Sequence, residues 1–411
     1  MSERAILHSD LNCFFASVET VLNPDYRGKA IAVCGSTEDR HGIVLAKSES
    51  ARRAGVATGM VNWQARRLCP ELIIVEPHYE YYAKFSELVR RIYYRYTDLV
   101  EPFGLDECWL DVTGSSAFGS PSEIAESIRW SVRDELGLTV SIGVSFNKVF
   151  AKLGSDMKKP DAVTVIDRDN FRKKVWPLDV SDLLYVGRSS CRKLHEYGIF
   201  TIGELALTPV DTLERILGVN GKMLSSYARG EDESRVMHKD YVSPMKSLGH
   251  GITCTADLVN EDEVWRVLLA LSQDLGHRLR VHGLAASGVQ LSVKDNDLKM
   301  YQFRCRLPVI SQSPYEIALC ARRLFTRYDW KKNVRALTVQ TIDLVPQEQS
   351  FQTDLFTDYS RSEKQQSIDD AVDNIRNRFG KRAVSPASLM GDLKMPDHSD
   401  RQNILPGMMY K

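Results

Sequence analysis

The sequence predicts an α/β (α+β) protein of several domains, and three observations support this. Residues 1–176 alternate strand-like apolar runs with segments of helical spacing. Residues 177–240 contain short helices with glycine-containing turns, and residues 245–346 repeat a strand–helix–strand pattern. With 411 residues, 43% of them hydrophobic and 26% charged, the chain is long enough for two to four globular domains.

The first region predicts a mixed sheet with helices between its strands. Pro121 begins one expected helix and Gly137 ends it, which is the usual asymmetry of helix termini. The expected strands are Ala5–Leu7, Ala30–Cys34, Ile43–Ala46, Thr139–Val144 and Ala162–Ile166, and the expected helices are Cys13–Leu22, Pro121–Leu136 and Asn147–Met157.

Two glycine-containing turns, Val186–Ser190 and Leu217–Lys222, connect the short helices of the next region. The first turn fits a helix–hairpin–helix, in which the backbone around Gly187 and Arg188 would bind a DNA phosphate without reading sequence. An ordinary connection between two helices would have the same spacing.

Residues 231–244 are polar and indicate a linker, and the region after them predicts a four-stranded sheet backed by two helices. Residues 245–346 contain 14 Lys and Arg against 10 Asp and Glu, an excess that DNA binding and a solvated face explain equally well. The expected helices are Glu261–Arg280 and Pro314–Tyr328, and the strands include Gly288–Val293, Tyr301–Arg306 and Ala336–Leu344.

The tail, residues 347–411, contains the pentapeptide Gln352–Phe356 and then an apolar stripe with helical spacing. A helix with such a stripe either docks on the protein or binds another partner. The stripe consists of Ile368, Ala371, Val372, Ile375 and Phe379.

Composition argues against several classes of protein. The chain has no run of about 18 apolar residues, so no membrane span is expected. The N-terminus leads directly into a strand-like segment, and we expect no signal peptide. The eight cysteines include no Cys-x-x-Cys pair, which favours reduced thiols in a cytoplasmic protein over disulfides or a zinc site. Because the formal net charge is zero, any face that binds nucleic acid must be local.

Three carboxylates at the edges of apolar runs are the main candidates for chemistry: Asp10, Asp106 and Glu107. Adjacent residues of a regular strand point to opposite faces, but after Pro102 and Gly104 the backbone can turn both acids toward one point. Carboxylates this close repel one another unless divalent cations bind between them, as in metal-assisted nucleotidyl transfer. Ordinary charges at a loop–strand junction are the alternative.

Three segments resemble the motifs of Y-family translesion DNA polymerases, most closely those of the bacterial DinB/UmuC-like branch. They are His8–Glu19, Leu105–Thr113 and Ser141–Lys152. The resemblance covers residues 5–346 and implies a palm (1–35 and 77–176), small fingers (36–76), a helical thumb (177–230) and a DNA-binding little finger (245–346).

The resemblance also implies roles for residues. Asp10, Asp106 and Glu107, with the backbone carbonyl of Leu11, would bind two Mg²⁺ ions that activate the primer 3′-hydroxyl and hold the triphosphate. Phe15 matches the steric gate, a ring that leaves no room for a ribose 2′-hydroxyl. Without the motif, Phe15 would be interpreted as a core aromatic residue.

The backbone amides of Cys13, Phe14 and Phe15, at a helix start, and the cations Arg52 and Lys159 would bind the triphosphate.

Three residues depart from the family pattern. The first is Asn12, where many relatives have Asp. The second is Glu49, where many have a Tyr that contacts the triphosphate, so this acid needs a neutralising partner among Lys47, Arg52 and Arg53. The third is Tyr185, which replaces the first glycine of the helix–hairpin–helix.

The pentapeptide resembles the bacterial sliding-clamp-binding peptide, in which Leu355 and Phe356 would fill a pocket and Gln352 would hydrogen-bond at its rim. We therefore expect a monomeric, template-directed, error-prone translesion DNA polymerase whose partners are primer–template DNA, dNTPs and the sliding clamp. One alternative is a DNA- and clamp-binding scaffold without catalysis. Another is a different two-metal nucleotidyl transferase, such as a nucleotide cyclase.

Overall fold

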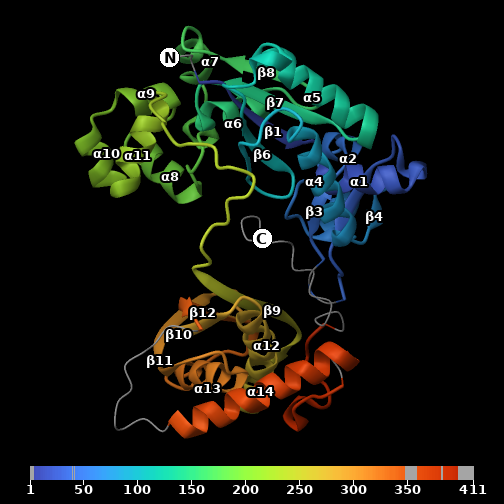
Figure 1. Cartoon of the computed structure of the whole chain (residues 1–411), viewed down its shortest axis with the longest axis vertical. Coiled ribbons are helices and arrows are strands. Elements are labelled where there is room, and N and C mark those ends of the chain that lie inside the picture. Colours follow the sequence, from blue (N-terminus) through green and yellow to red (C-terminus); the bar gives the residue numbers. More distant parts are fainter. Residues whose placement is uncertain (1–3, 39, 41, 348–358, 381–382, 397–411) are drawn as a thin grey trace. The chain divides into compact units, whose positions relative to one another are not determined.

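The computed structural model describes residues 4–347, 359–380 and 383–396, except residues 39 and 41. The described chain forms two compact units (Figure 1). Of the described residues, the first comprises 4–35 and 44–243, and the second comprises those in 36–43 and from 244 to 396. The finer division into palm, fingers, thumb and little finger remains a prediction. No described helix has both the length and the hydrophobicity that are needed to cross a membrane.

A five-stranded sheet forms the centre of the first unit. Its middle strand β1 pairs antiparallel with β6 and β7, whereas β7 and β8 run parallel, so the sheet is mixed as predicted. The strand order is β5 (Val100–Pro102), β6 (Glu107–Asp111), β1 (Ile6–Leu11), β7 (Val140–Ser145) and β8 (Val163–Ile166).

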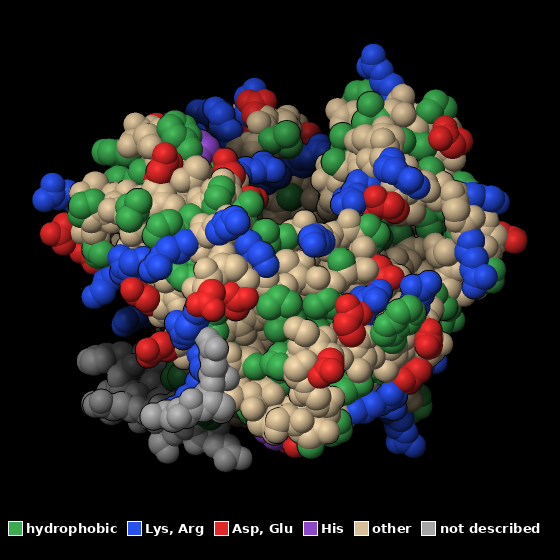
Figure 2. All heavy atoms as spheres, turned by 90° about the horizontal axis from the view of Figure 1, so that it is seen from above, with side chains coloured by type: hydrophobic (Ala, Val, Ile, Leu, Met, Phe, Trp, Pro, Cys, Tyr) green, Lys and Arg blue, Asp and Glu red, His purple; other side chains and the backbone are tan. Residues whose placement is uncertain are grey.

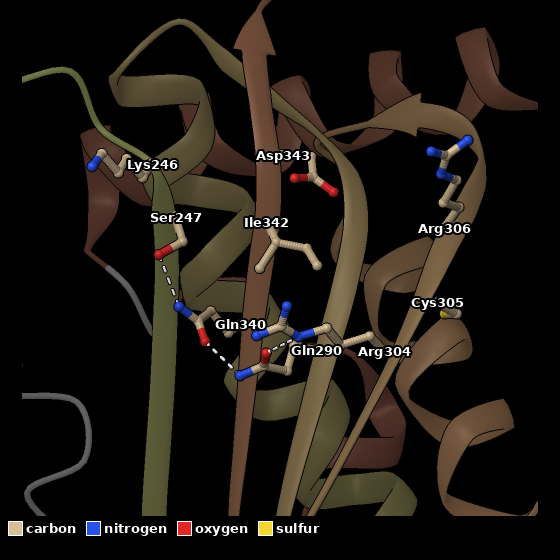
Figure 3. Close-up of a pocket in the computed structure, with 9 residues that line it drawn as sticks. All are labelled: Lys246, Ser247, Gln290, Arg304, Cys305, Arg306, Gln340, Ile342 and Asp343. Carbon is tan, nitrogen blue, oxygen red and sulfur yellow. Dashed lines mark hydrogen bonds between the residues drawn. The ribbon is translucent and has the colours of Figure 1, made fainter. Parts of the chain in front are cut away.

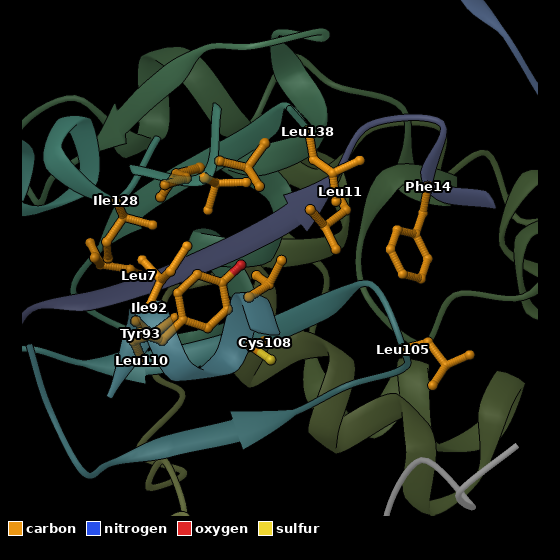
Figure 4. Close-up of a cluster of buried hydrophobic side chains, with 14 of the residues drawn as sticks. Leu7, Leu11, Phe14, Ile92, Tyr93, Leu105, Cys108, Leu110, Ile128 and Leu138 are labelled. Carbon is orange, nitrogen blue, oxygen red and sulfur yellow. The ribbon is translucent and has the colours of Figure 1, made fainter. Parts of the chain in front are cut away.

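Helices cover both faces of this sheet. Leu7 joins a core with side chains of three helices (Figure 4), whereas its neighbour Ile6 contacts Ala151 of a fourth helix on the opposite face. The first three helices are α1 (Phe14–Leu22), α4 (Tyr79–Tyr93) and α5 (Pro121–Leu136), and the fourth is α6 (Lys148–Met157). All six residues of β1 are therefore buried.

Local features determine where α5 begins and ends and how closely α6 approaches the sheet. Ser120 and Glu123 form a capping box before α5, and Gly137 ends this helix at a φ of 67°, which confirms the predicted helix limits. Gly143 on β7 lets α6 approach the sheet, because a Cβ atom there would lie 1.9 Å from the carbonyl oxygen of Ala151.

A smaller three-stranded sheet packs against the short helices α2 (Glu49–Arg53) and α3 (Asn62–Leu68). Its strands are β3 (Val44–Lys47), β2 (Ile31–Cys34) and β4 (Ile73–Val75). This small module has a core of its own, made largely of alanine and cysteine side chains.

The last part of the first unit is helical. Its helices share a core that includes Leu194, Leu213 and Leu224. They are α7 (Phe171–Val175), α8 (Arg188–Glu196), α9 (Ile202–Leu207), α10 (Val210–Leu217) and α11 (Val219–Ala228). Residues 231–243 have no helix or strand, yet Val236 is buried in a cluster with Ile6, so the polar segment that was expected as a linker is partly packed on this unit.

The second unit has the predicted sheet of four antiparallel strands, with α12 (Glu261–Val281) and α13 (Pro314–Phe325) packed against it. The order is β11 (Met300–Ser311), β10 (Leu284–Asp295), β12 (Val334–Pro346) and β9 (Ser247–Leu258). Cys305 on β11 and Cys320 on α13 lie side by side with their Cα atoms 7.4 Å apart, and the other six cysteines are free.

The tail contains the expected helix, α14 (Tyr359–Phe379), which docks on α12 through polar groups. The carboxylate of the buried Asp373 accepts a hydrogen bond from Arg280 at 2.7 Å and lies 3.1 Å from His277. Ile375 and Phe379 of the apolar stripe are exposed. Figure 2 shows basic and acidic side chains interspersed over one face of the molecule, in keeping with its formal net charge of zero.

Candidate active site

Two neighbouring strands bring the three carboxylates together. Asp10 on β1 is directly opposite Glu107 on β6, and opposed residues of an antiparallel pair point to the same face. Asp106 lies one residue before β6, where its carbonyl oxygen accepts a hydrogen bond from the Leu11 N–H at 3.0 Å. The charges of Asp10 and Glu107 act on the Asp106 carboxylate, so the three acids are neighbours.

Two lysines form ion pairs with these carboxylates. Lys159 Nζ lies 2.8 Å from Asp10 Oδ2, and Lys152 Nζ lies 3.4 Å from the same atom and 3.0 Å from Glu107 Oε1. Asp156 bonds both ammonium groups, at 3.2 Å and 2.9 Å. Because Asp10 is only 6% exposed, solvent screens these interactions weakly.

Burial and the neighbouring charged groups together shift the pKa values of the three carboxylates in different directions. Burial raises the pKa of Asp10 more than Lys159 and Lys152 lower it. Burial, together with the charges of Asp10 and Glu107, raises the pKa of Asp106 to about 6. Burial also acts to raise the pKa of Glu107, but a hydrogen bond with His8 and the charge of Lys152 bring it down to about 2.

The donor set fits a hard divalent cation. It consists of the carboxylate oxygens of Asp10, Asp106 and Glu107, which are the ligands that Mg²⁺ prefers. Repulsion between the charges of the acids contributes to the raised pKa of Asp106, and a bound cation would remove it.

Sequence reasoning included Lys159 but missed three other residues around the carboxylates: His8, Lys152 and Asp156. The buried His8 lies 3.3 Å from Glu107 Oε2 and 2.8 Å from Ser155 Oγ. Its position two residues before Asp10, on the same face of a strand, could have identified it. The helical spacing of Lys152 and Asp156, four residues apart, was the corresponding signal on α6.

Phe15 lies at the start of α1 and is only partly buried, whereas Phe14 is in the core. The Phe15 ring stacks on Tyr82, with centroids 4.1 Å apart and planes 10° apart. The Tyr82 hydroxyl donates a 2.5 Å hydrogen bond to the buried carboxylate of Glu19, which is also 3.0 Å from His78 Nδ1. These hydrogen bonds fix the position of the Tyr82 ring on which Phe15 stacks.

The predicted triphosphate residues lie on three elements. Cys13, at a φ of 49°, precedes α1, and the first N–H groups of a helix have no acceptor within it. Arg52 forms a 2.9 Å ion pair with Glu49, so it is the expected partner of this acid. A cavity of about 500 Å³ is lined by Cys13 and Glu49, among other residues. Lys159 instead bonds Asp10 and Asp156.

The predicted phosphate-binding turn lies at the start of α8. Gly187 is the residue before this helix and Arg188 is its first residue. Tyr185 adopts a φ of 69°, a left-handed conformation that glycine favours, and its ring is 6.2 Å from that of Tyr227. The turn thus has a glycine-like backbone although a tyrosine replaces the glycine.

The sheet of the second unit carries a polar cavity of about 580 Å³ (Figure 3). Gln340 donates to Ser247 at 2.8 Å and accepts from Gln290 at 2.9 Å, and Arg304 donates to Gln290. Arg306 and Lys246 also line this cavity. The residues that were predicted to bind the clamp, Gln352, Leu355 and Phe356, lie outside the described residues.

Comparison with known proteins identifies the class. Residues 9–156 match the impB/mucB/samB family, and residues 245–355 match the C-terminal domain of that family. A solved Y-family DNA polymerase chimera has the same fold, with a TM-score of 0.75 and 24% identity over 83% of this chain and 99% of that one. The chain therefore belongs to the impB/mucB/samB family.

Its relatives define its place in this class more closely. The chain is 47% identical to the DNA polymerase IV of Acetivibrio thermocellus over 95% of this chain and 98% of that protein. It is 39% identical to the DNA polymerase IV of Moorella thermoacetica over 95% and 97%, and 35% identical to DNA polymerase IV 1 of Bacillus subtilis over 93% and 92%. It is thus a DNA-directed DNA polymerase, which binds DNA and deoxynucleoside triphosphates.

Proposed function

We propose that this polymerase is template-directed and error-prone, acts in translesion synthesis, and uses two Mg²⁺ ions for nucleotidyl transfer. The observation that carries the proposal is the register that sets Asp10 opposite Glu107, with Asp106 beside them. The translesion role is supported by the small sheet with α2 and α3, because a module of this size cannot wrap the nascent base pair tightly.

Asp10, Asp106, Glu107 and the Leu11 carbonyl would hold the metal ions. Bound Mg²⁺ would supply charge that acidifies the primer 3′-hydroxyl and stabilises the leaving pyrophosphate. The contacts of Glu107 with Lys152 and His8 keep its carboxylate in one orientation and favour its ionised form, so this acid is ready to act as a ligand.

The chain would bind the triphosphate by exchanging ion pairs. Lys159 would leave Asp10 for a phosphate oxygen, which would also free Asp10 to bind metal. Arg52 would leave Glu49 in the same way. The amides of Cys13, Phe14 and Phe15 would add neutral donors, and the Phe15 ring, held by Tyr82, would exclude a 2′-hydroxyl.

DNA would be held without base readout by two surfaces. Gly187 and Arg188 would bind a backbone phosphate at the start of α8. Arg304 and Arg306, on the polar face of the second sheet, would bind further phosphates. The pentapeptide with Gln352, Leu355 and Phe356 would attach the monomeric enzyme to a sliding clamp, and the double change Leu355→Ala and Phe356→Ala should abolish clamp binding.

Primer extension tests the proposal. With Mg²⁺ and dNTPs the intact chain should extend a primed template, and both Asp106→Ala and the isosteric Asp106→Asn should abolish synthesis. Asp134→Asn, which removes an exposed acid on α5, should leave extension unchanged. A folded, DNA-binding intact chain that makes no product would instead support the scaffold alternative.

A further inference from the structure

A second group of potential metal ligands lies in the helical part of the first unit, and the proposed polymerase reaction does not use it. Cys191 and His195 are one helical turn apart on α8, and Asp179 precedes this helix at the start of a short turn, Val180–Asp182. No Cys-x-x-Cys pair occurs here, so that spacing does not mark the group. The signal was a cysteine and a histidine four residues apart on a helix.

The three side chains already have nearly the spacing of metal ligands. Their ligand atoms all lie within 4.8 Å of one another, and Cys191 Sγ is 3.5 Å from His195 Nε2. Tetrahedral zinc with ordinary Zn–S and Zn–N lengths separates these two atoms by about 3.5 Å. Only a small movement of the Asp179 carboxylate would complete three ligands.

The surrounding contacts hold these side chains in place. Asp179 Oδ1 accepts hydrogen bonds from the Ser181 N–H at 2.8 Å and from its hydroxyl at 2.6 Å, which leaves Oδ2 as the ligand atom. The His195 ring is 5.0 Å from that of Phe200, and the buried Leu194 anchors α8 between the two ligands.

A thiol–imidazole hydrogen bond would account for the Cys191–His195 contact, but it would not account for the third ligand. The Asp179 carboxylate lies close to the sulfur and nitrogen atoms, with all three ligand atoms within 4.8 Å of one another, as a cation between them would require.

We propose that Asp179, Cys191 and His195 form a binding site for a divalent transition-metal ion of the zinc class. Sulfur and imidazole ligands favour such an ion over Mg²⁺ or Ca²⁺, and three protein ligands leave a fourth position for water. The ion would join the turn at Asp179 to α8. Since the Cys191 N–H donates to the Gly187 carbonyl oxygen at 2.9 Å, this link would also stiffen the start of α8.

Cobalt binding tests the site in the full, reduced chain, with excess Mg²⁺ present to occupy oxygen-only sites. One equivalent of Co²⁺ should produce thiolate-to-cobalt charge-transfer absorption in the near ultraviolet. Cys191→Ser should remove this absorption, and His195→Gln should weaken Co²⁺ binding at least about tenfold, since loss of a ligand costs no less than loss of its supporting partner. Glu196→Gln, an exposed change on the same helix, should have no effect.

Absence of the charge-transfer absorption in the intact chain, or its retention in Cys191→Ser, would overturn the proposal. Hydrogen exchange provides a second measurement that does not depend on the spectrum. Added Zn²⁺ should slow exchange between residues 179 and 201 in the intact chain but not in Cys191→Ser. Unchanged exchange in this segment of the intact chain would exclude the site.

Discussion

The two larger sheets of this polymerase differ in how much of each is covered. Helices cover both faces of the sheet that holds Asp10, and every residue of β1 is buried. In the second unit, β11 alternates exposed residues with less exposed ones. Catalytic carboxylates need positions that burial and ion pairs fix, whereas DNA binding can be shared among many solvated groups. Single substitutions should therefore cost much in the first sheet and little on the exposed face of the second.

A matched pair of glycine substitutions tests this difference most strongly. In Gly143→Ala, the new Cβ would lie 1.9 Å from a backbone oxygen of α6, so the helix and its Lys152 must move away from the sheet. We expect a loss of about 3 kcal/mol or more in stability, and loss of primer extension. Thermal unfolding and extension assays would measure both effects.

Gly249→Ala is the control on β9 of the second sheet. Its nearest contact would be 3.4 Å, to the flexible side chain of Gln340, so stability should change by no more than about 0.5 kcal/mol. Equal losses in the two variants would show that the covered and open sheets do not differ in tolerance.

A second test, in the first unit, measures how strongly the enzyme prefers dNTP over rNTP. Phe15→Ala should reduce the preference for dNTP over rNTP by at least about tenfold, because the ring no longer blocks the 2′-hydroxyl. Tyr82→Phe keeps the stacked ring but removes the hydrogen bond to Glu19, so it should reduce stability by about 1–3 kcal/mol and selection by less. Steady-state incorporation of both sugars would measure this, and unchanged selection in Phe15→Ala would show that Phe15 is not the gate.

A substitution on the exposed face of the second sheet should have a smaller effect, which is measured on primer–template binding. Arg304→Ala should weaken primer–template binding a few-fold and reduce the salt slope of binding by about 1, because a phosphate contact is lost. Lys331→Ala, at an exposed lysine paired with Asp329, should change neither quantity. A tenfold or larger loss in Arg304→Ala would mean that this face depends on a single residue after all.

Sequence was enough to predict features that depend on local chemistry. The limits of α5 follow from Pro121 and Gly137. It was not enough for features set by pairing of distant segments. The contact of His8 with Glu107 depends on the register of β1 and β6, which sequence spacing does not specify.

The tail helix itself was predicted, but its docking was left open for a related reason. Periodicity identified the apolar stripe of α14, but the contact with α12 is made by Asp373 on another side of the helix, with Arg280 and His277. A buried ion pair can orient a helix as well as apolar packing can, and a single helix sequence does not reveal which partner it will meet. The backbone of Tyr185 illustrates the same limit, because its neighbours hold a conformation that its own side chain disfavours.

Substitution of Glu49, in the exposed pair of Glu49 and Arg52, should give the smallest effect. The direction of that effect distinguishes an acid that holds Arg52 from one that binds the nucleotide itself. The two side chains are 36% and 46% exposed, so their 2.9 Å ion pair contributes no more than about 1 kcal/mol. Glu49→Gln would release Arg52 toward the triphosphate and should lower the KM for dNTP by up to about fivefold, with kcat unchanged, whereas Glu87→Gln, which breaks the comparable pair with Arg91, should not. A rise in KM would contradict this view and would mean that the Glu49 carboxylate itself takes part in binding the nucleotide. Such an acid would then belong with the buried carboxylates in function, although its exposure places it with the solvated groups.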